Sequence, residues 1–358
     1  MKKIRLNLIP GDGIGIEVVR ESTRVLGKIS ELHGGISFLA NELDWGCGYY
    51  LKHGTMMPQD GLSILADCDA ILLGAIGFPG VADHVSVQGL LFPIRQGFDQ
   101  YINMRPIKML EGLDSPLKAS RPEDIDFVVI RENSEGEYCG KGSISNQGTP
   151  EEAVVQEAHF SRKGTTRVIR YAFEYARSHG RASVASATKS NALNYSMVFW
   201  DKIFGEVKAS YPDIASRSIH VDALAGMFIL KPQMFEVVVA SNLFGDILTD
   251  LGSAMLGSIG ISPSANINPE KRFPSMFEPI HGSAPDIAGK GIANPLGTLW
   301  SMVMMLEHLD LPDMAGMLMK AVASVVASGT VKTPDMGGTG TTSQVVDEVC
   351  RQLDRAGR

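Results

Sequence analysis

Short apolar runs alternate along the chain with longer stretches of helical periodicity. Nearly continuous apolar runs favour strands that are buried under helices on both faces of a sheet. We therefore expect strands at 4–9, 36–43, 70–73, 127–130, 182–187, 218–221 and 237–240. Apolar positions with a period near 3.6 predict helices at 16–32, 85–98, 165–179, 191–209, 242–256, 296–309, 312–328 and 341–355. This alternation predicts an α/β fold.

One segment, residues 135–164, breaks this pattern. It is rich in glycine, serine and charged residues and has little helical period. Two interpretations are equally supported: an arm that reaches a second subunit, and a mobile loop. The length of 358 residues predicts about two domains. Because no Pro/Ser-rich linker separates them, we expect the chain to cross between the domains more than once.

Composition and charge narrow the class of protein. Hydrophobic residues make up 44%, charged residues 20%, and the net charge is -7. An acidic chain without a Lys/Arg run argues against a nucleic-acid partner. No apolar stretch approaches the roughly 20 residues of a membrane span, and the first apolar run meets Asp12 too early for a signal peptide. The four cysteines form no C-x-x-C pair, which predicts reduced thiols in a cytoplasmic protein without a zinc site.

The sharpest candidate site is a polar stripe that follows the predicted strand 237–240. Asn242, Asp246 and Asp250 are four residues apart and share one helix face. The stripe is either a solvated face or a ligand site, and ligands in open α/β sheets bind beyond the carboxyl ends of strands. Paired carboxylates there favour Mg²⁺ or Mn²⁺. Asp222, after another predicted strand, is a third candidate, although a lone aspartate there is more often a cap.

Three arginines and two proton carriers are further candidates. Arg95, Arg105 and Arg131 would clamp a dianionic substrate if they converge, because guanidinium groups match carboxylates bidentately. Spacing alone does not show convergence. Lys189 closes a predicted strand, and a partly desolvated lysine near a metal can act as a base. Tyr138 can supply a proton to a carbanion or enolate. Taken singly, each of the two is more often structural.

Two glycine-rich segments are candidates for nucleotide binding. Residues 11–15 read G-x-G-x-G, which departs from the dinucleotide fingerprint, and no clear acidic residue occupies the expected ribose position. Residues 281–294 offer backbone amides, a histidine that can stack on a base, and Asp286 as an acceptor for ribose hydroxyls. The same carboxylate would repel a 2′-phosphate, so this segment favours NAD over NADP.

Five motifs occur in an order that identifies a family resemblance. They are Gly11–Gly15, Asn103–Pro106, Ile130–Tyr138, Ser241–Asp250 and Glu278–Asp286. Together they resemble the isopropylmalate/isocitrate/tartrate dehydrogenase family of β-decarboxylating dehydrogenases over residues 4–349. The resemblance implies a two-domain α/β fold with a mixed, largely parallel sheet and a dimer arm. It also implies a first, NAD-binding domain of 1–101 plus 260–358, and a second domain of 102–259 with the dimer interface and the arm.

The resemblance also assigns a role to each candidate residue. It implies a homodimer with shared active sites, a small-molecule 2-hydroxy dicarboxylate as substrate, and NAD, Mn²⁺ or Mg²⁺, with K⁺ as a further candidate cation. Arg95, Arg105 and Arg131 would clamp the substrate, and Asp246, Asp250 and a partner subunit's Asp222 would hold the metal. Lys189 from the partner would accept the hydroxyl proton during oxidation, and Tyr138 would return a proton after CO2 leaves. The NAD segment would comprise His281, Gly282, Ser283, Ala284, Pro285, Asp286, Ile287 and Asn294.

The sequence leaves open which third substituent the substrate carries. In this family the helix before Arg95 reads it, and here Leu91 and its two neighbours are apolar, as in isopropylmalate enzymes, while Gln88 replaces their usual glutamate. Residues 98–105 and 265–270 are similar to the tartrate dehydrogenase/D-malate dehydrogenase branch, which we favour. The alternatives are 3-isopropylmalate dehydrogenase of leucine biosynthesis, a related 2-alkylmalate enzyme, and a catalytically silent regulatory subunit. No expected catalytic position is missing, which argues against the last.

Overall fold

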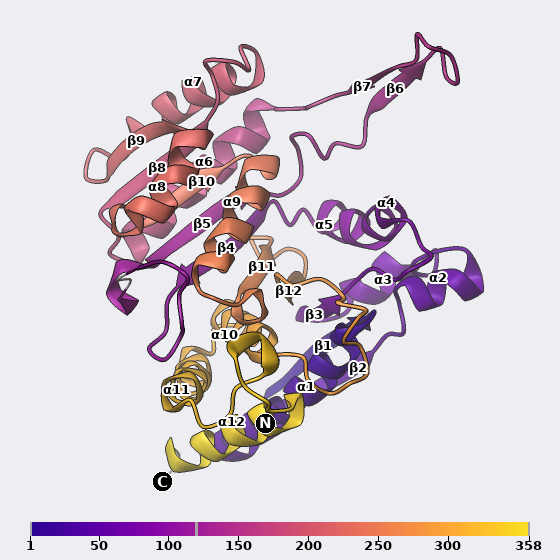
Figure 1. The fold of residues 1–358 in the computed structure, drawn as a ribbon, viewed down its shortest axis with the longest axis vertical. Coiled ribbons are helices and arrows are strands. Elements are labelled where there is room, and N and C mark those ends of the chain that lie inside the picture. Colours follow the sequence, from indigo (N-terminus) through magenta and orange to yellow (C-terminus); the bar gives the residue numbers. More distant parts are fainter. Residues whose placement is uncertain (1, 119–120, 357–358) are drawn as a thin grey trace. The chain divides into compact units, whose positions relative to one another are not determined.

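The computed structural model describes residues 2–118 and 121–356, and its α/β architecture agrees with the predicted fold class (Figure 1). Contacts divide the chain into unit 1, Met1–Gln100 with Lys108–Pro122 and Ser253–Arg358, and unit 2, Tyr101–Ile107 with Glu123–Gly252. The predicted domain ranges differ from these units chiefly at 108–122, and their ends, residues 1 and 358, lie outside the described residues. The chain crosses between the units repeatedly.

The sheet of unit 1 is mixed. Its strand order is β2 (Ile36–Glu42), β1 (Lys2–Gly11), β3 (Ala70–Ala75), β12 (Ser275–Pro279) and β11 (Pro263–Ile267). The first four strands pair in parallel, whereas β11 runs antiparallel to β12. Every residue of β3 is buried, as expected for a strand with helices on both of its faces.

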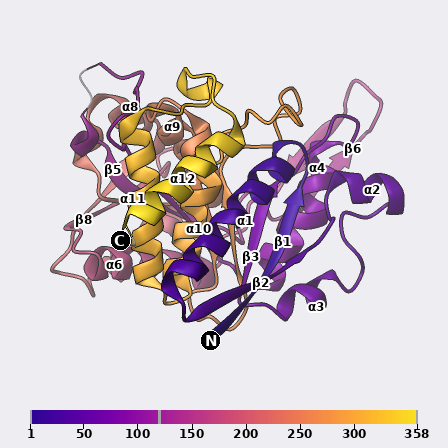
Figure 2. The ribbon, with the colours of Figure 1, turned by 90° about the horizontal axis from the view of Figure 1, so that it is seen from below.

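One face of this sheet is covered by long helices. They are α1 (Ile14–His33), α10 (Leu296–His308), α11 (Pro312–Ser328) and α12 (Thr342–Ala356), and Figure 2 shows them side by side. The buried positions of α1, among them Val18, Val25 and Ile29, recur at helical spacing, and the helix ends where Gly34 adopts the left-handed conformation. Nearly all of α10 is buried because α1 and α11 flank it over the sheet.

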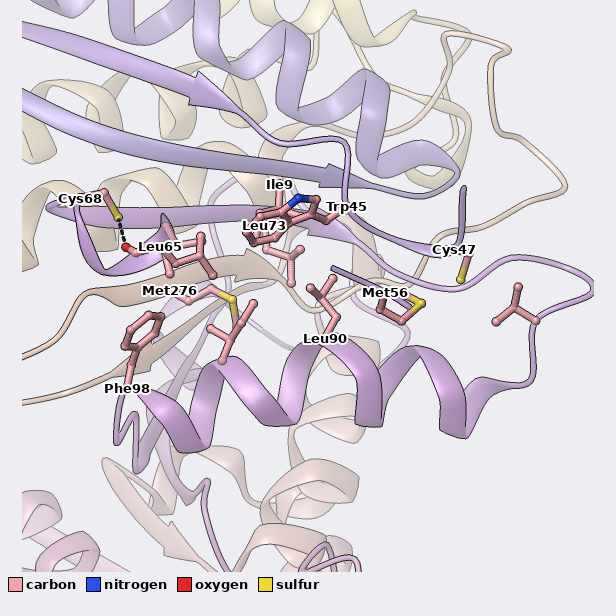
Figure 3. Close-up of a cluster of buried hydrophobic side chains, with 13 residues drawn as sticks. Ile9, Trp45, Cys47, Met56, Leu65, Cys68, Leu73, Leu90, Phe98 and Met276 are labelled. Atoms are coloured by element: carbon pink, nitrogen blue, oxygen red, sulfur yellow. Dashed lines mark hydrogen bonds between the residues drawn. The ribbon is translucent and has the colours of Figure 1, made fainter. Parts of the chain in front are cut away.

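The other face of unit 1 holds the core shown in Figure 3. Short helices cover it: α2 (Cys47–His53), α3 (Gly61–Ala66), α4 (Asp83–Ser86) and α5 (Phe92–Gly97), with a π-helical turn at Val87–Leu91. The single helix predicted at 85–98 is therefore interrupted by this turn. Leu90 is fully buried in this core and Leu91 packs partly against it. The labelled members are Ile9, Trp45, Cys47, Met56, Leu65, Cys68, Leu73, Leu90, Phe98 and Met276.

Unit 2 has a second series of strands, in the order β4 (Ile102–Lys108), β5 (Asp126–Glu132), β10 (Val237–Ala240), β8 (Ser183–Thr188) and β9 (Ala215–His220). β10 pairs in parallel with β5 and β8, and β8 with β9. The helices are α6 (Arg162–Ser178), α7 (Ser196–Lys208), α8 (Val221–Leu230) and α9 (Asn242–Met255). Ser161 caps α6 by accepting a hydrogen bond from the Gly164 amide.

Residues 135–164 include a hairpin of β6 (Gly142–Ser145) and β7 (Ala153–Gln156), which extends away from the rest of unit 2 in Figure 1. Its residues are exposed on both strands. The segment thus contains a β-hairpin. Contact of this arm with a second subunit stays a prediction.

Four short 3-10 helices are also present in the described residues: Pro122–Asp124, Pro232–Met234, Ile259–Ile261 and Pro334–Met336. The sequence pattern did not predict β4, β6, β7, β11, β12, α2, α3 or α8. It placed Asp222 directly after a strand, and the residue follows β9 in the first turn of α8. Within the described ranges, no helix combines the length and hydrophobicity needed to cross a membrane.

Candidate active site

Asp246 is the point on which the candidate site of unit 2 converges. Strand β10 ends at Ala240 and α9 begins at Asn242, so the polar face of α9 starts at the carboxyl end of the sheet. A Cβ on Gly245 would lie 2.6 Å from Arg131 Cγ, so a glycine at this position lets the arginine lie against the helix.

Arg131, the last residue but one of β5, lies in register with Ala240 and is only 2% exposed. Its Nη1 donates to Asp246 Oδ1, while Nε and Nη2 donate to Asn242 Oδ1 at 3.1 and 2.7 Å. A buried guanidinium needs such partners, because an unpaired charge in the interior is strongly unfavourable.

Arg105 approaches the same carboxylate from β4. Its Nη1 donates to Thr249 Oγ1 at 2.6 Å and to Asp246 Oδ1 at 3.4 Å, and it lies 3.9 Å from Asp250 Oδ1. The structure therefore brings Arg105, Asp246 and Asp250 together, with Arg131 beside them. Arg95 belongs to unit 1, where its Nη2 donates to buried Glu278 at 2.9 Å. Asn266 donates to the same Glu278 oxygen at 2.7 Å.

Tyr138 completes this cluster. Its hydroxyl donates to Asp246 Oδ2 at 2.9 Å, and burial, reinforced by the Asp246 charge, raises the pKa of Tyr138 to about 12. The phenol is therefore protonated at neutral pH and able to donate. The turn before it is held by Glu132, a residue that the sequence did not single out. The Glu132 carboxylate accepts from the amides of Ser134 and Glu135, both at 2.8 Å.

Lys189 and Asp222 form a separate pair in the single chain. Lys189 follows β8, Asp222 lies near the start of α8, and Nζ is 2.7 Å from Asp222 Oδ1. This contact holds the pKa of Asp222 below its ordinary value, and the carboxylate side chain is 67% exposed. Within the chain the two side chains bond to each other, and donation of both residues across a dimer stays a prediction.

The carboxylates of α9 fit part of a divalent-metal site. Asp246 and Asp250 lie one helical turn apart and offer the oxygen ligands that Mg²⁺ and Mn²⁺ prefer. Across residues 2–118 and 121–356, however, no group of three or more His, Cys, Asp or Glu side chains is positioned to hold a metal ion. Within one chain, Asp222 therefore does not join the other two aspartates.

The predicted nucleotide segment borders a pocket of about 690 Å³ in unit 1. This volume lies in the range of small-molecule sites. Its lining combines apolar side chains with polar groups: Ile14, Ile259, His281, Ile287, Asn294 and Asp335. Asn294 Nδ2 donates to Asp335 Oδ2 at 2.9 Å, so the pocket has an acidic residue that the sequence pattern did not reveal. Asp286 is exposed, and it directly precedes Ile287, which lines the pocket.

The loop 11–15 has a structural role beside this pocket. The Asp12 carboxylate accepts from the amides of Cys47, Gly77 and Gly48 at 2.9, 3.0 and 3.4 Å. It thereby fills a nest of backbone N–H groups with the protein's own anion. Gly13 has φ +56°, and the amide of Ile14 donates to the Ser283 carbonyl at 2.8 Å, which anchors the loop to the nucleotide segment.

Comparison with known proteins gives full-length matches. The family model described as isocitrate/isopropylmalate dehydrogenase matches residues 5–349. A probable tartrate dehydrogenase/decarboxylase of Bacillus subtilis (strain 168) is 50% identical, with 99% of each chain covered. A D-malate dehydrogenase [decarboxylating] of Escherichia coli (strain K12) is 49% identical over 99% of this chain and 100% of the relative. The crystal structure of isocitrate dehydrogenase from Methylococcus capsulatus superposes with a TM-score of 0.87 at 34% identity, covering 99% of both chains.

Proposed function

Because this chain belongs to the isocitrate/isopropylmalate dehydrogenase family, whose members are oxidoreductases acting on a CH–OH group, we propose that it oxidises D-malate or tartrate with NAD. The β-carboxylate of the resulting 2-oxo acid then leaves as CO2. The convergence of Arg131, Arg105 and Tyr138 on Asp246 is the observation that carries the proposal. The names of the relatives at 49–50% identity support this substrate class.

Arg105 and Arg131 suit a small dicarboxylate. Both side chains are more than nine-tenths buried, and their charges are offset by Asp246. Two desolvated guanidinium groups bind carboxylates more strongly than exposed ones, because little water competes for their donors. Arg95 is the third member of the proposed clamp.

The metal is proposed to be Mn²⁺ or Mg²⁺, with Asp246, Asp250 and a second subunit's Asp222 as its ligands. When bound, such an ion supplies Lewis-acid polarisation of the hydroxyl and carbonyl oxygens. Release of Asp246 from Tyr138 and Arg131 would free the phenol to act on substrate and the guanidinium to bind it. The chain's own contacts thus hold the proposed catalytic and substrate-binding groups close to the proposed metal ligand.

Proton transfer is divided between two side chains in this proposal. Lys189 Nζ, from the second subunit, would accept the hydroxyl proton during oxidation, and a bound NAD would serve as the hydride acceptor. Tyr138 Oη donates a proton to the carbanionic carbon left by CO2. Its protonated state at neutral pH supports this assignment. The pocket around His281 and Asp335 is proposed to hold the adenosine half of NAD.

The test is a substrate screen of the purified protein with NAD, Mn²⁺ and K⁺. NADH and CO2 should form in equal amounts with D-malate or with tartrate. If NADH formed only with 3-isopropylmalate, the protein would be a 3-isopropylmalate dehydrogenase, in which Leu91 contacts an apolar substituent of the substrate. No turnover of any of the three acids, in protein that still binds NAD, would indicate a regulatory subunit.

Metal dependence is tested in the same assay. EDTA should abolish CO2 release, and Mn²⁺ should restore it. Asp246→Asn should weaken Mn²⁺ binding measured by calorimetry while leaving the circular dichroism of the folded protein unchanged. Asp213→Asn, which changes an exposed aspartate paired with Arg177, is the matched control. Full CO2 release from metal-free protein would refute the metal assignment.

A further inference from the structure

The side chain of Asn242 bonds in two directions at the start of α9. Its Oδ1 accepts from Nε and Nη2 of Arg131 at 3.1 and 2.7 Å, and its Nδ2 donates to the Glu135 carbonyl at 3.0 Å. The residue is only 3% exposed. All three bonds lie within unit 2. Asn242 therefore connects the end of β5 to the first residue of the 135–164 segment.

Hydrogen bonds join the two ends of the arm to each other, between residues 135–136 and residues 159–161; we call these residues the arm base. The Glu135 carboxylate accepts from the amide and the hydroxyl of Ser161, at 2.8 and 2.5 Å. Gly136 and His159 exchange two backbone hydrogen bonds of 2.8 and 3.0 Å. Gly136 has φ +82°, and a Cβ there would come within 3.2 Å of Asn242 Cβ. These contacts fasten the two ends of the arm to each other and to α9.

We propose that Asn242 is a positioning residue that couples the base of the arm to Arg131, so that the arm's attachment helps to set the position of the substrate arginine. The role of Arg131 in substrate binding rests on the proposed function, whereas the coupling itself rests on contacts alone. Both polar atoms of the Asn242 side chain are engaged: Oδ1 accepts from two nitrogens of Arg131, and Nδ2 donates to the Glu135 carbonyl. Movement at either end breaks a buried hydrogen bond of Asn242, which is unfavourable.

Tyr138 strengthens the connection. It lies two residues after Gly136 and bonds to Asp246, one turn beyond Asn242 on the same helix face. The start of the arm is thus attached to α9 at two successive turns. Loss of the Asn242 contact should loosen the arm base while Tyr138 still binds Asp246.

The test is a double-mutant cycle read by amide hydrogen exchange at Gly136 and His159 in the full-length protein. Asn242→Ala and Arg131→Met should each raise exchange at both amides, by about fivefold or more. The double variant should exchange no faster than Asn242→Ala, because the effect of Arg131 passes through Asn242. Asn41→Ala, which removes an amide bonded to Asn7 in unit 1, should leave both amides unchanged. Additive single effects, or unchanged exchange in Asn242→Ala, would overturn the coupling.

Asn242→Asp separates the two bonds and serves where the alanine variant does not fold. Aspartate keeps an acceptor for Arg131 but loses the donor to Glu135. Exchange at the arm base should rise as in Asn242→Ala, while KM for D-malate should rise less than in that variant. Equal KM values in the two variants would mean that the hydrogen bonds from Arg131 to residue 242 do not help to position the arginine. If the wild-type protein oxidises none of the tested acids, the proposed function fails, and the exchange cycle still decides the coupling.

Discussion

At the scale of single residues, Asp246 binds both the proposed substrate-binding arginines and the proposed proton donor. It accepts from two arginines and from a tyrosine that stays protonated. Tyr138→Phe removes only the hydroxyl and should leave hydride transfer intact. Decarboxylation and protonation should slow by ~10²–10⁴-fold, the usual worth of general acid–base catalysis. Pre-steady-state NADH absorbance with D-malate, beside the rate of oxaloacetate decarboxylation, measures the two steps separately.

Lys189→Met should give the opposite pattern, with slow formation of the first NADH and oxaloacetate decarboxylation preserved. Tyr211→Phe, which removes a hydroxyl bonded to Glu174 at 3.3 Å away from the site, is the control. The assignment would be reversed if Tyr138→Phe abolished the first NADH turnover and left oxaloacetate decarboxylation untouched.

Cofactor choice is also set by single residues. Asp286 is expected to accept from the ribose of NAD and to repel a 2′-phosphate. Asp286→Lys should shift the ratio of kcat/KM values toward NADP, by roughly tenfold or more. Lys290→Ala, in the same segment, is the control for loss of local structure. Comparable efficiency of the wild-type protein with NAD and NADP would count against this role.

The sequence indicated Asp246, Asp250, Arg105 and Arg131 because each stands in a short motif with a recognisable context. Convergence was not predictable, because Arg105 and Asp246 are 141 positions apart and meet only through the order of the strands. Glu132 lies inside the motif Ile130–Tyr138 but offers no sign of its role, and Asp335 stands in no motif. Only the fold brings their partners to them.

At the scale of elements, the end of α10 carries a pH-dependent contribution to stability. Burial, helped by the Lys271 charge, lowers the pKa of His308 from 6.5 to about 4. A helix C-terminus favours a cation, but that effect is smaller than the burial here. Above pH 6.5 the histidine is neutral in both states and costs nothing. As pH falls from 6.5 to 4, the unfolded chain takes up the proton first, so stability is lost over that range.

His308→Gln removes this titration. Relative to the variant, the wild-type protein should lose about 2 kcal/mol of unfolding free energy between pH 7 and pH 5, because each pKa unit corresponds to about 1.4 kcal/mol. Urea unfolding of both proteins at the two pH values measures the difference. A parallel pH dependence of the two proteins would exclude a buried neutral His308.

Periodicity explains which elements were predictable. α1, α6, α10 and α11 have long apolar stripes and differ from their predicted ends by a few residues at most. β11 and β12 contain proline, serine or asparagine and show no apolar run, although all their residues are buried. Their polar side chains find partners inside unit 1, which composition alone does not reveal.

At the scale of the whole molecule, activity should require two subunits. Tyr195, Leu230 and Val154 are large side chains more than half exposed in the single chain, as expected of surfaces that a dimer covers. If Lys189 serves the partner's site, the Lys189→Ala protein, which is slow in oxidation, and the Tyr138→Phe protein, which is slow in decarboxylation, should complement each other in the complete conversion of D-malate to CO2. A mixture at equilibrium holds about half heterodimers with one complete site each, so about a quarter of wild-type activity should return.

Subunit exchange in that mixture is confirmed by native mass spectrometry of differently tagged proteins. Each variant incubated alone is the control. Heterodimers that form and stay inactive would mean that each subunit completes its own site.

The carboxylate of Asp12 should let this part of the protein fold without a bound anion. It satisfies amides that would otherwise await an anion, so the loop reaches its final form during folding, before any nucleotide arrives. The newly made chain should therefore mature without waiting for its cofactor. Binding of the proposed NAD would then be a reversible, later event that adds stability only by mass action. A cell short of NAD would accumulate intact protein awaiting cofactor, and not misfolded chains.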